Sequence, residues 1–455
     1  MLSYGQVTQA LGPLLREARP GRRGRFRTVS NDSRTLRPGD LFFALKTEQR
    51  DGHDFLGHAV EGGAAGAVVQ REDVEVPVGV ALFRVADTQR ALGELAGWWR
   101  SRRQVKVIGV AGNVGKTTTK EIAAAVLGAR YGVLKSPANF NDEAGISMSL
   151  FGLKPRHQRA VLEMAMYSLG EIRRLCEIAR PEVGVITNVG PTHLERLGSM
   201  EALANAKAEL VESLPPHGAA VLNGDDPIVR GMAARTRAHT VLFGTGPGCE
   251  VRGRLVGSRG LEGIGFVLEY QGAEAQVSAP LPGRHLLHNA LAAAAVGLVD
   301  DMSLQEVAQA LAKARVPLRL QVYRGRQGAT ILDDSYNASP SSMLAALDLL
   351  GEVPGRRIAV LGDMRELGPE EERGHRVVGQ RAAEVAEVIH AVGRLGRIIG
   401  ETARQAGHPC VALWDSKEEA AREVAGSLEP GDVVLLKASR ALALETVLPI
   451  LRDEA

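Results

Sequence analysis

The sequence predicts an α/β protein of three domains, each built around a mainly parallel sheet. Short β-branched runs alternate with stretches of helical periodicity, which is typical of parallel sheets covered by helices. The chain also has 455 residues, more than one domain usually holds. We therefore expect a small N-terminal α/β domain (residues 1–98), a central P-loop-type parallel-sheet domain (99–315) and a C-terminal Rossmann-like α/β domain (316–455).

The composition is ordinary for a soluble globular protein, with 45% hydrophobic and 24% charged residues. The 55 Lys and Arg residues nearly balance the 53 Asp and Glu residues, which gives no reason to expect nucleic acid or an acidic membrane as a partner. One basic cluster lies near the N-terminus, and it is either a solvated surface or an attractor for an anionic substrate. Its members are Arg16, Arg19, Arg22, Arg23, Arg25 and Arg27.

The cysteines and the N-terminal segment bear on the compartment. Cys176, Cys249 and Cys410 are far apart and form no C-x-x-C pair, so neither a disulfide framework nor a zinc ribbon is indicated. The segment MLSYGQVTQALG lacks the charged and apolar regions of a signal peptide, and no apolar run is long enough to span a bilayer. We expect a cytoplasmic monomer without membrane insertion.

The expected strands and helices follow in order along the chain. The first domain has the apolar runs LFFAL (41–45), GAAGAVV (63–69) and VALFRVA (80–86). The central domain has strands at VIGV (107–110), RAVLEMA (159–165) and EVGVITNVG (182–190), and helices at 170–179, 199–214 and 288–299. The third domain has strands at ATILDDSY (329–336), RRIAVLGD (356–363), EVIHAVG (387–393) and GDVVLLKAS (431–439).

The stretch GVAGNVGKTTTKE (109–121) has the character of a phosphate-binding loop. It follows a strand and opens a helix, and backbone N–H groups at a helix N-terminus favour phosphate. Gly112 and Gly115 let the backbone curl, Lys116 supplies charge, and the Thr117 hydroxyl suits Mg²⁺. The flanking strand and helix favour this interpretation over a plain glycine turn that caps a helix.

The loop is one residue tighter than the common G-x-x-x-x-G-K-[ST] pattern. This tighter form, G-x-x-G-K-T-T, resembles the Mur ligase family of ATP-dependent amide-forming enzymes of bacterial cell-wall precursor synthesis. The family usually has Thr, Ser and Asn where this chain has Ala111, Asn113 and Val114; we expect phosphate binding to survive, because the contacts come mainly from the backbone. The predicted ATP contacts in the loop are Gly112, Asn113, Val114, Gly115, Lys116, Thr117 and Thr118.

A ligase of this kind phosphorylates a carboxylate, and metal ions are needed to bridge the anionic groups. From spacing alone, Glu163, His193 and Lys207 are as well explained as structural residues. The family resemblance implies more: Glu163 and His193 match metal ligands, and Lys207 matches a lysine that many members carry as a carbamate. With Thr117, these residues form the predicted site for Mg²⁺, with two ions expected, and with Lys116 they form the predicted catalytic set.

The resemblance also implies nucleotide contacts outside the loop. Asn289 matches an asparagine that hydrogen-bonds adenine, although Leu286 stands where the family usually has a second one, and His288 is a candidate substitute. Arg319 matches an arginine that reaches ATP phosphate from the third domain. Asp334 matches an aspartate that faces the ribose.

Motifs in the third domain discriminate between members of the family. LDDSYNASPSSM (332–343) and AVLGDMRELG (359–368) resemble the branch that adds D-alanyl-D-alanine to UDP-N-acetylmuramoyl-tripeptide. The stretches NDSRTLRPGDLFFAL, ANFNDEAGIS and KASRALALE resemble the same branch, although Ser339 and Ala438 depart from its pattern. The residues predicted to contact the substrates are Ser33, Arg34, Asn139, Asn141, Asn188, Asn337, Asp363, Ser439 and Arg440.

The function implied by the resemblance is ligation of D-alanyl-D-alanine to UDP-N-acetylmuramoyl-tripeptide through an acyl phosphate, with the third domain closing over ATP. Two alternatives stay open: a sibling that adds a diamino acid, and a non-catalytic paralogue that only binds nucleotide. A regulatory P-loop switch protein would leave the third domain unexplained, and the sequence has no guanine-binding N-K-x-D motif.

Overall fold

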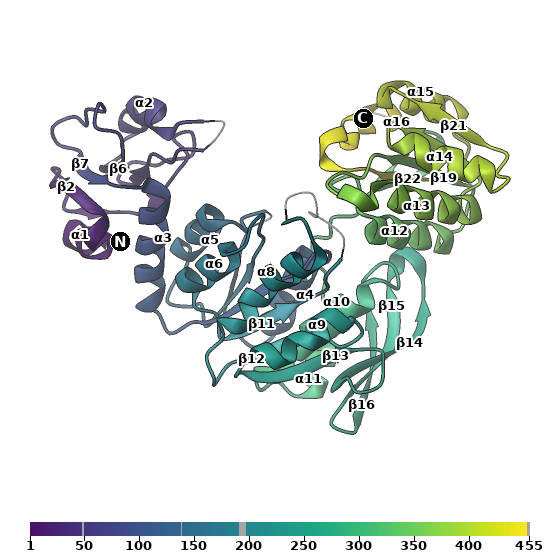
Figure 1. The fold of residues 1–455 in the computed structure, drawn as a ribbon, viewed down its shortest axis with the longest axis horizontal. Helices are drawn as coiled ribbons and strands as arrows, with labels where there is room; N and C mark the ends of the chain where they lie inside the picture. Colours follow the sequence, from purple (N-terminus) through teal and green to yellow (C-terminus); the bar gives the residue numbers. More distant parts are fainter. Residues whose placement is uncertain (48–49, 138, 191–196, 453–455) are drawn as a thin grey trace.

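The computed structural model describes residues 1–47, 50–137, 139–190 and 197–452. Three α/β bodies follow one another along the chain, and the first and third stand apart on either side of the central one (Figure 1). The four sheets are two-, five-, nine- and six-stranded, and the three larger ones are mainly parallel. The predicted α/β fold class with three domains is thereby confirmed.

The first domain is a five-stranded sheet with strand order β2-β7-β6-β5-β4. Three strands of its parallel part, β5, β6 and β7, correspond to the apolar runs expected from the sequence, and β4 was not expected. Strand β2 adds an antiparallel edge, and β1 pairs with β3 in the separate two-stranded sheet. The strands are β1 (Leu2–Ser3), β2 (Leu15–Arg19), β3 (Arg25–Phe26), β4 (Val29–Ser30), β5 (Leu41–Phe43), β6 (Gly66–Val69) and β7 (Ala81–Val85), and the helices are α1 (Tyr4–Leu11), α2 (Leu56–Glu61) and α3 (Thr88–Ser101).

The central domain is a nine-stranded sheet with strand order β16-β15-β14-β13-β12-β11-β8-β10-β9. Its strands are β8 (Lys106–Ala111), β9 (Val133–Lys135), β10 (Arg159–Glu163), β11 (Val183–Ile186), β12 (Ala219–Asn223), β13 (His239–Gly244), β14 (Val251–Ser258), β15 (Ile264–Tyr270) and β16 (Ala273–Ala279). Its helices are α4 (Lys116–Gly128), α5 (Glu143–Phe151), α6 (Glu171–Ala179), α8 (Met200–Glu212), α9 (Pro227–Gly231), α10 (Leu286–Val299) and α11 (Leu304–Ala312). The expected parallel pairing of β8, β10 and β11 is confirmed. The antiparallel extension formed by β14, β15 and β16 was not anticipated from the sequence.

Both faces of the central sheet are covered, because side chains of β8 alternate between two hydrophobic clusters. Ile108 and Val110 pack against α4 and α10, whereas Val107 packs in the cluster that contains α5, α6 and α8. Helix α10 is nearly all Ala, Leu and Val and is buried on almost every side, which fits its place between the sheet and α11. A sheet enclosed on both faces leaves its strand ends as the open positions for chemistry.

The third domain is a six-stranded sheet with strand order β17-β18-β22-β19-β20-β21. Among the described strands of this sheet, only β17 pairs antiparallel with its neighbour. The four strands expected from the sequence are parallel: β22 lies between β18 and β19, and β19 also pairs with β20. The strands are β17 (Gln321–Arg324), β18 (Thr330–Asp333), β19 (Arg357–Gly362), β20 (Val388–Val392), β21 (Val411–Trp414) and β22 (Val433–Lys437), and the helices are α12 (Pro340–Glu352), α13 (Glu371–Val385), α14 (Gly396–Gln405), α15 (Lys417–Ser427) and α16 (Leu448–Leu451).

The proposed boundaries fall at two different kinds of position. Residue 98 lies inside α3, which therefore continues from the first domain to the start of the central one. Residue 315 lies in the connection between α11 and β17. Within the described part of the chain, no helix has the length and apolar character needed to cross a bilayer.

Candidate active site

The phosphate-type loop runs from the end of β8 to the start of α4. Gly112 and Gly115 have φ values of 139° and 84°, in the region that favours glycine, and Gly115 is the N-terminal cap of α4. The Lys116 ammonium folds back over the loop and donates to the Asn113 carbonyl at 2.9 Å. The loop therefore has the backbone conformation and the cation that phosphate binding requires.

Two residues after β11 hold the loop in this shape. The Asn188 side chain accepts from the Val114 N–H at 2.9 Å and donates to the Val114 carbonyl at 2.8 Å. The Thr187 hydroxyl donates to the same carbonyl at 2.7 Å. Val114 is thus used through its backbone, which explains why its apolar side chain is tolerated there. The amide of Asn188 is occupied by the loop, and its assignment as a substrate contact stays a prediction.

The Glu163 carboxylate lies at the end of β10 beside the loop and is fully buried. One of its oxygens accepts from the Thr117 hydroxyl at 2.7 Å, and the other accepts from the Asn141 amide at 3.0 Å. Both partners are neutral, so among the described residues the charge of Glu163 is not balanced by an ion pair. A buried carboxylate in this condition is a favourable ligand for a cation.

Two lysines at this site, Lys116 and Lys207, have lowered pKa values. Burial lowers the pKa of Lys116 to about 8; Glu163 opposes this shift and Arg319 adds to it. Lys207, on α8, is 2% exposed, and burial followed by repulsion from Lys116 holds its pKa well below the usual range. Lys207 is therefore disposed to be a neutral amine, the form that reacts with carbon dioxide.

The predicted histidine ligand, His193, lies in the range 191–196, which is outside the described residues. No cluster of three or more His, Cys, Asp or Glu side chains that could hold a metal occurs in the part of the chain that is described. The oxygens of Thr117 and Glu163 nevertheless suit Mg²⁺, which prefers oxygen ligands and keeps several waters. The residues present thus fit the metal that was expected.

The predicted adenine contact, Asn289, packs against the same loop from α10. Its amide donates to the Gly115 carbonyl at 3.1 Å and to the Thr119 hydroxyl at 2.9 Å. Nearby, His288 contacts the Asp225 carboxylate at 2.8 Å. Burial raises the pKa of Asp225, but hydrogen bonds from the Thr245 backbone, His288 and the Gly246 backbone outweigh it and hold the pKa at about 2. Asp225 was not among the predicted site residues, because its partners lie far away in the sequence.

Arg319 connects the third domain to the loop. Its guanidinium donates to the Thr117 hydroxyl at 2.8 Å and lies 4.3 Å from the centre of the Tyr336 ring. Asp334 pairs with Lys437, a residue only 2% exposed that also donates to the Asn337 carbonyl at 3.1 Å. Lys437 was not among the predicted site residues, although it opens the KASR motif.

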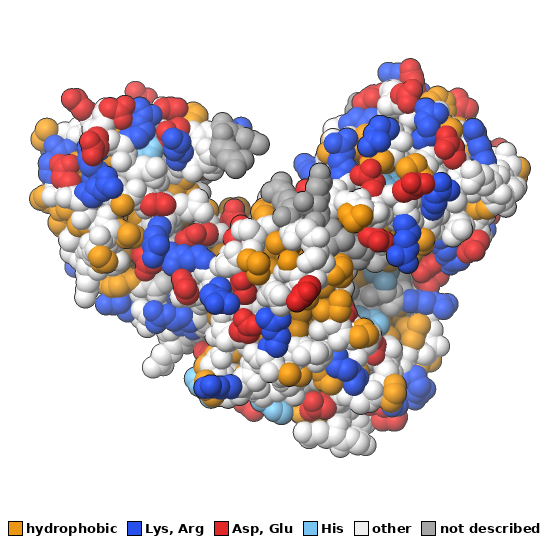
Figure 2. Space-filling view, viewed as in Figure 1, with side chains coloured by type: hydrophobic (Ala, Val, Ile, Leu, Met, Phe, Trp, Pro, Cys, Tyr) orange, Lys and Arg blue, Asp and Glu red, His pale blue; other side chains and the backbone are white. Residues whose placement is uncertain are grey.

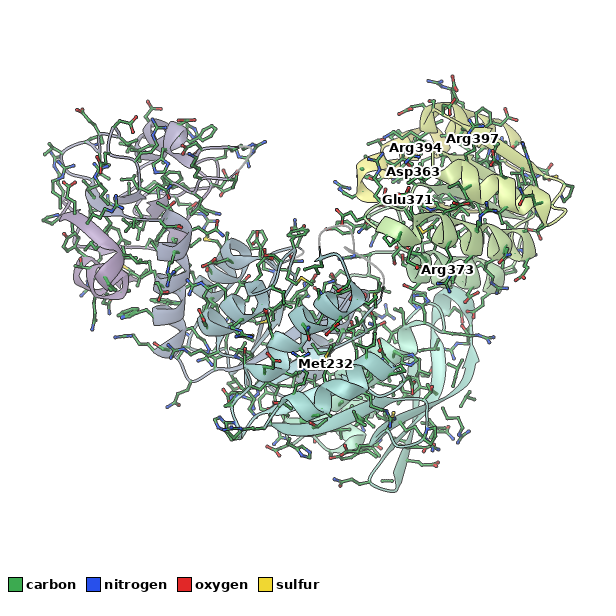
Figure 3. The ribbon with its side chains drawn as sticks, in the orientation of Figure 1. Met232, Asp363, Glu371, Arg373, Arg394 and Arg397 are labelled. Atoms are coloured by element: carbon green, nitrogen blue, oxygen red, sulfur yellow. The ribbon has the colours of Figure 1, made fainter. Side chains whose placement is uncertain are left out.

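The other third-domain candidates lie at the carboxyl end of the sheet. The Asn337 side chain accepts from the Arg440 N–H at 3.4 Å, and the Ser439 hydroxyl is buried without a partner among the described residues. The Asp363 carboxylate accepts from the Leu395 and Gly396 N–H groups, both at 2.9 Å, and so stabilises the start of α14. Figure 3 shows Asp363 in the third domain near Glu371 and Arg394.

The remaining candidates divide between the other two domains. Asn139 and Asn141 lie between β9 and α5, and only Asn141 reaches Glu163. In the first domain, Arg34 is paired with Asp32 and the Ser33 hydroxyl contacts His58 at 3.0 Å. Neither Ser33 nor Arg34 lines the cavity at the loop. Figure 2 shows the first and third domains separated by open space above the central domain.

A cavity of about 1300 Å³ joins the central and third domains. The central domain contributes the loop, Asn188, Asp225 and Asn289, and the third domain contributes Arg319, Asp334 and the 336–342 segment. Its size is sufficient for a nucleotide together with a second ligand. A cavity lined from two sides in this way is typical of an α/β enzyme that holds a phosphate ligand at one domain and its partner at another.

Comparison with known proteins identifies the family. The Mur ligase middle domain matches residues 110–297, the glutamate ligase domain of Mur ligases matches 318–440, and the Mur ligase family catalytic domain matches 25–100. The chain belongs to the Mur ligase family, as the loop and the ordered motifs predicted.

Individual relatives agree over almost the whole chain. A UDP-N-acetylmuramoyl-tripeptide--D-alanyl-D-alanine ligase of Synechocystis is 37% identical and covers 94% of this chain and 93% of its own. The crystal structure of MurF from Acinetobacter baumannii is 29% identical and superposes with a TM-score of 0.87 over 98% of this chain and 97% of that one. MurF ligase from Thermotoga maritima, solved in complex with ADP, is 31% identical with a TM-score of 0.81 over 93% and 96%.

The shape of the loop gives a first prediction. A Cβ at Gly112 would collide with the Thr187 hydroxyl and would force an L-residue into positive φ. Gly112→Ala should therefore weaken binding of ATP, used as the phosphate-bearing probe, by roughly tenfold or more, since such strain costs about 1–3 kcal/mol. Isothermal titration calorimetry measures this.

Gly128→Ala is the matched control for that substitution. Gly128 is the last residue of the same helix, and its added Cβ would meet nothing within 4 Å. We expect this variant to bind ATP as the unaltered protein does. Equal affinity in Gly112→Ala would mean that the loop does not contact phosphate.

Proposed function

We propose that this protein is an ATP-dependent ligase that joins D-alanyl-D-alanine to UDP-N-acetylmuramoyl-tripeptide and releases ADP and phosphate. Relatives that carry this name match more than nine-tenths of the chain at up to 37% identity. The product is the UDP-linked pentapeptide precursor of peptidoglycan. ATP and the UDP-linked substrate are cytoplasmic metabolites, so the enzyme acts in the cytoplasm, and we propose that it does so as a monomer.

The observation that carries the proposal is the meeting of Arg319 and Glu163 at the Thr117 hydroxyl, where Thr117 and Arg319 line the large cavity and Glu163 is buried beside it. These side chains come from the loop, from the end of β10 and from the segment that enters the third domain. A hydroxyl, a buried carboxylate and a guanidinium at one place are suited to bind a triphosphate, a metal and the charge of phosphoryl transfer. A protein that only binds nucleotide would not need the third-domain arginine there.

In the first step, an oxygen of the tripeptide carboxylate attacks the γ-phosphorus of ATP. A P–O bond forms to the carboxylate, and the bond between the γ-phosphorus and the β–γ bridging oxygen breaks to release ADP. Lys116 and Arg319 supply positive charge to the phosphoryl oxygens, and the N–H groups of the loop bind the phosphates that stay behind. Mg²⁺, bound by Thr117, Glu163 and a carbamylated Lys207, would neutralise the repulsion between carboxylate and phosphate.

In the second step, the neutral amine of D-alanyl-D-alanine attacks the acyl carbon. The C–N bond forms, the amine gives up a proton to solvent, and the C–O bond to phosphate breaks, so that inorganic phosphate leaves. Asn337, Ser439 and Arg440 line the third-domain wall of the cavity, and we propose that they position the dipeptide. Closure of this domain over the cavity excludes water, which would otherwise hydrolyse the acyl phosphate.

The carbamate on Lys207 is a separate part of the proposal. Burial and the neighbouring Lys116 disfavour the ammonium form of Lys207. A neutral amine can add to carbon dioxide and lose a proton, which gives a carbamate anion. That change converts a neutral amine beside the Lys116 ammonium into an anion, and we propose that its oxygens are a further ligand for the metal.

The remaining parts of the proposal rest on the family resemblance. Ser33 and Arg34 bind the uridine end of the substrate in the first domain, and Asn139 and Asn141 lie near its reacting carboxylate. Asn289 and Asp334 contact the adenine and ribose of ATP, with His288 beside them. Two Mg²⁺ ions are expected, and His193 is expected to hold one of them.

The function is tested by phosphate release from Mg²⁺ and ATP with UDP-N-acetylmuramoyl-tripeptide. We expect release only when D-alanyl-D-alanine is added, together with a UDP-linked pentapeptide detected by mass spectrometry. Single amino acids are the controls. Phosphate release with lysine or diaminopimelate, when the UDP-linked substrate carries a dipeptide in place of the tripeptide, would identify the diamino-acid-adding sibling. No release with any amine would identify a non-catalytic paralogue.

The carbamate is tested by replacing Lys207 with Ala. Turnover should fall by about tenfold to a hundredfold, as for loss of a group that orients a metal, and short carboxylic acids such as acetate should restore part of it. Acetamide, which has the same size but no charge, is the control and should restore none. Full activity of Lys207→Ala without added acid would contradict the carbamate.

A further inference from the structure

A second lysine on α4, Lys120, is completely buried although it has no part in the reaction described above. It lies one turn after Lys116 on the same helix, so it points toward the same side of α4. A buried ammonium costs several kcal/mol unless its donors and its charge are satisfied. Its partners therefore indicate what it stabilises.

Lys120 spans the space between α4 and the segment that follows β9. Its ammonium donates to the Ser136 carbonyl at 2.8 Å and lies 3.1 Å from the Glu121 carboxylate. Glu121 is also paired with Lys135, the last residue of β9, which is 45% exposed. Of the two lysines next to Glu121, only Lys120 is bonded to the backbone of the Ser136 segment among the described contacts.

Ser136 in turn fixes the end of β10. Its N–H donates to the Val161 carbonyl at 3.0 Å, and its hydroxyl accepts from the Glu163 N–H at 3.1 Å. Ser136 therefore continues the ladder between β9 and β10, which has its last residue pair at Val161 and Lys135. The Ser136 hydroxyl thus holds the backbone of Glu163, while Lys120 holds the main-chain carbonyl of the same Ser136.

The segment after Ser136 also reaches the carboxylate itself. Asn141 lies five residues further on, donates its amide to Glu163, and accepts at its carbonyl from the Ala165 N–H at 2.9 Å. Glu163 is therefore contacted at its backbone by Ser136, which Lys120 holds, and at its side chain by Asn141. Thr117, three residues before Lys120 on the helix, makes the remaining contact to Glu163.

We propose that Lys120 is a positioning residue for the metal site: it holds Ser136 against β10, and this fixes Glu163 opposite Thr117. This proposal rests on the proposed function, because it assigns Glu163 to Mg²⁺. The ammonium touches neither nucleotide nor substrate. Its effect is transmitted through Ser136.

The test compares the Mg²⁺ dependence of ATP binding in four variants, measured by calorimetry with and without Mg²⁺. Lys120→Met should reduce the gain in ATP affinity that Mg²⁺ provides by about tenfold, as for other groups that orient a metal ligand, with little change in metal-free binding. Lys120→Arg, which keeps a cationic donor, should restore part of it. Ser136→Ala should give the same shift as Lys120→Met, and the double variant should be no worse than either.

Lys135→Met is the matched control, because it removes the other partner of Glu121 and leaves the Ser136 carbonyl contact intact. We expect it to stay within about twofold of the unaltered protein, as surface substitutions usually do. Unchanged Mg²⁺ dependence in Lys120→Met would overturn the proposal, and so would an equal loss in Lys135→Met. If Lys120→Met does not fold, Ser136→Ala decides by the same criterion.

The calorimetry also separates this inference from the proposed function. The unaltered protein is assayed in parallel for phosphate release that depends on D-alanyl-D-alanine. Absence of release would contradict the proposed function alone, since the Mg²⁺ dependence of ATP binding is measured without any acceptor. Release with unchanged Mg²⁺ dependence in Lys120→Met would contradict the positioning role alone.

Discussion

The hydrogen bond from the Thr117 hydroxyl to the Glu163 carboxylate is the contact on which the rest of the site depends. It joins the first turn of α4 to the end of β10, and both groups are oxygen donors suited to Mg²⁺. The Glu163 side chain is fully buried and its hydrogen-bond partners are neutral, so a cation bound directly to it would be stabilised. The arrangement is preorganised for a metal and for the anions that a metal bridges.

Parallel pairing is what brings these groups together. Glu163, the last residue of β10, pairs in register with Val110 on β8, and Ile186 on β11 pairs with Ala111 on β8. The loop after β8, Glu163 at the end of β10 and Thr187 after β11 therefore lie at three adjacent strand ends. Helix α4 then combines three tasks within two turns: Lys116 over the loop, Thr117 at the carboxylate and Lys120 at the segment that supports it. Arg319 adds the third domain to this centre, and the same contact would couple ATP binding to domain closure.

Local patterns predicted the parts of the site that are local. The glycines, Lys116 and Thr117 lie within six residues of one another, whereas a strand-end position alone left the role of Glu163 open until the family resemblance was considered. Contacts between segments that are distant in the sequence could not be predicted from it. Asn188 and Asn289 contact the loop, and Asp363 stabilises the start of α14. Lys120 resembles any helix lysine until its burial is known. The antiparallel extension β14–β16 was missed because hairpin pairing depends on partners that periodicity does not specify.

The central claim is that this site phosphorylates the substrate carboxylate. The most direct test labels the reacting carboxylate of UDP-N-acetylmuramoyl-tripeptide with oxygen-18 and analyses the released phosphate by mass spectrometry. An acyl phosphate requires that one labelled oxygen leave with the phosphate when the amide forms. Phosphate with one oxygen-18 is the predicted result. Unlabelled phosphate, formed together with the ligated product, would contradict the account.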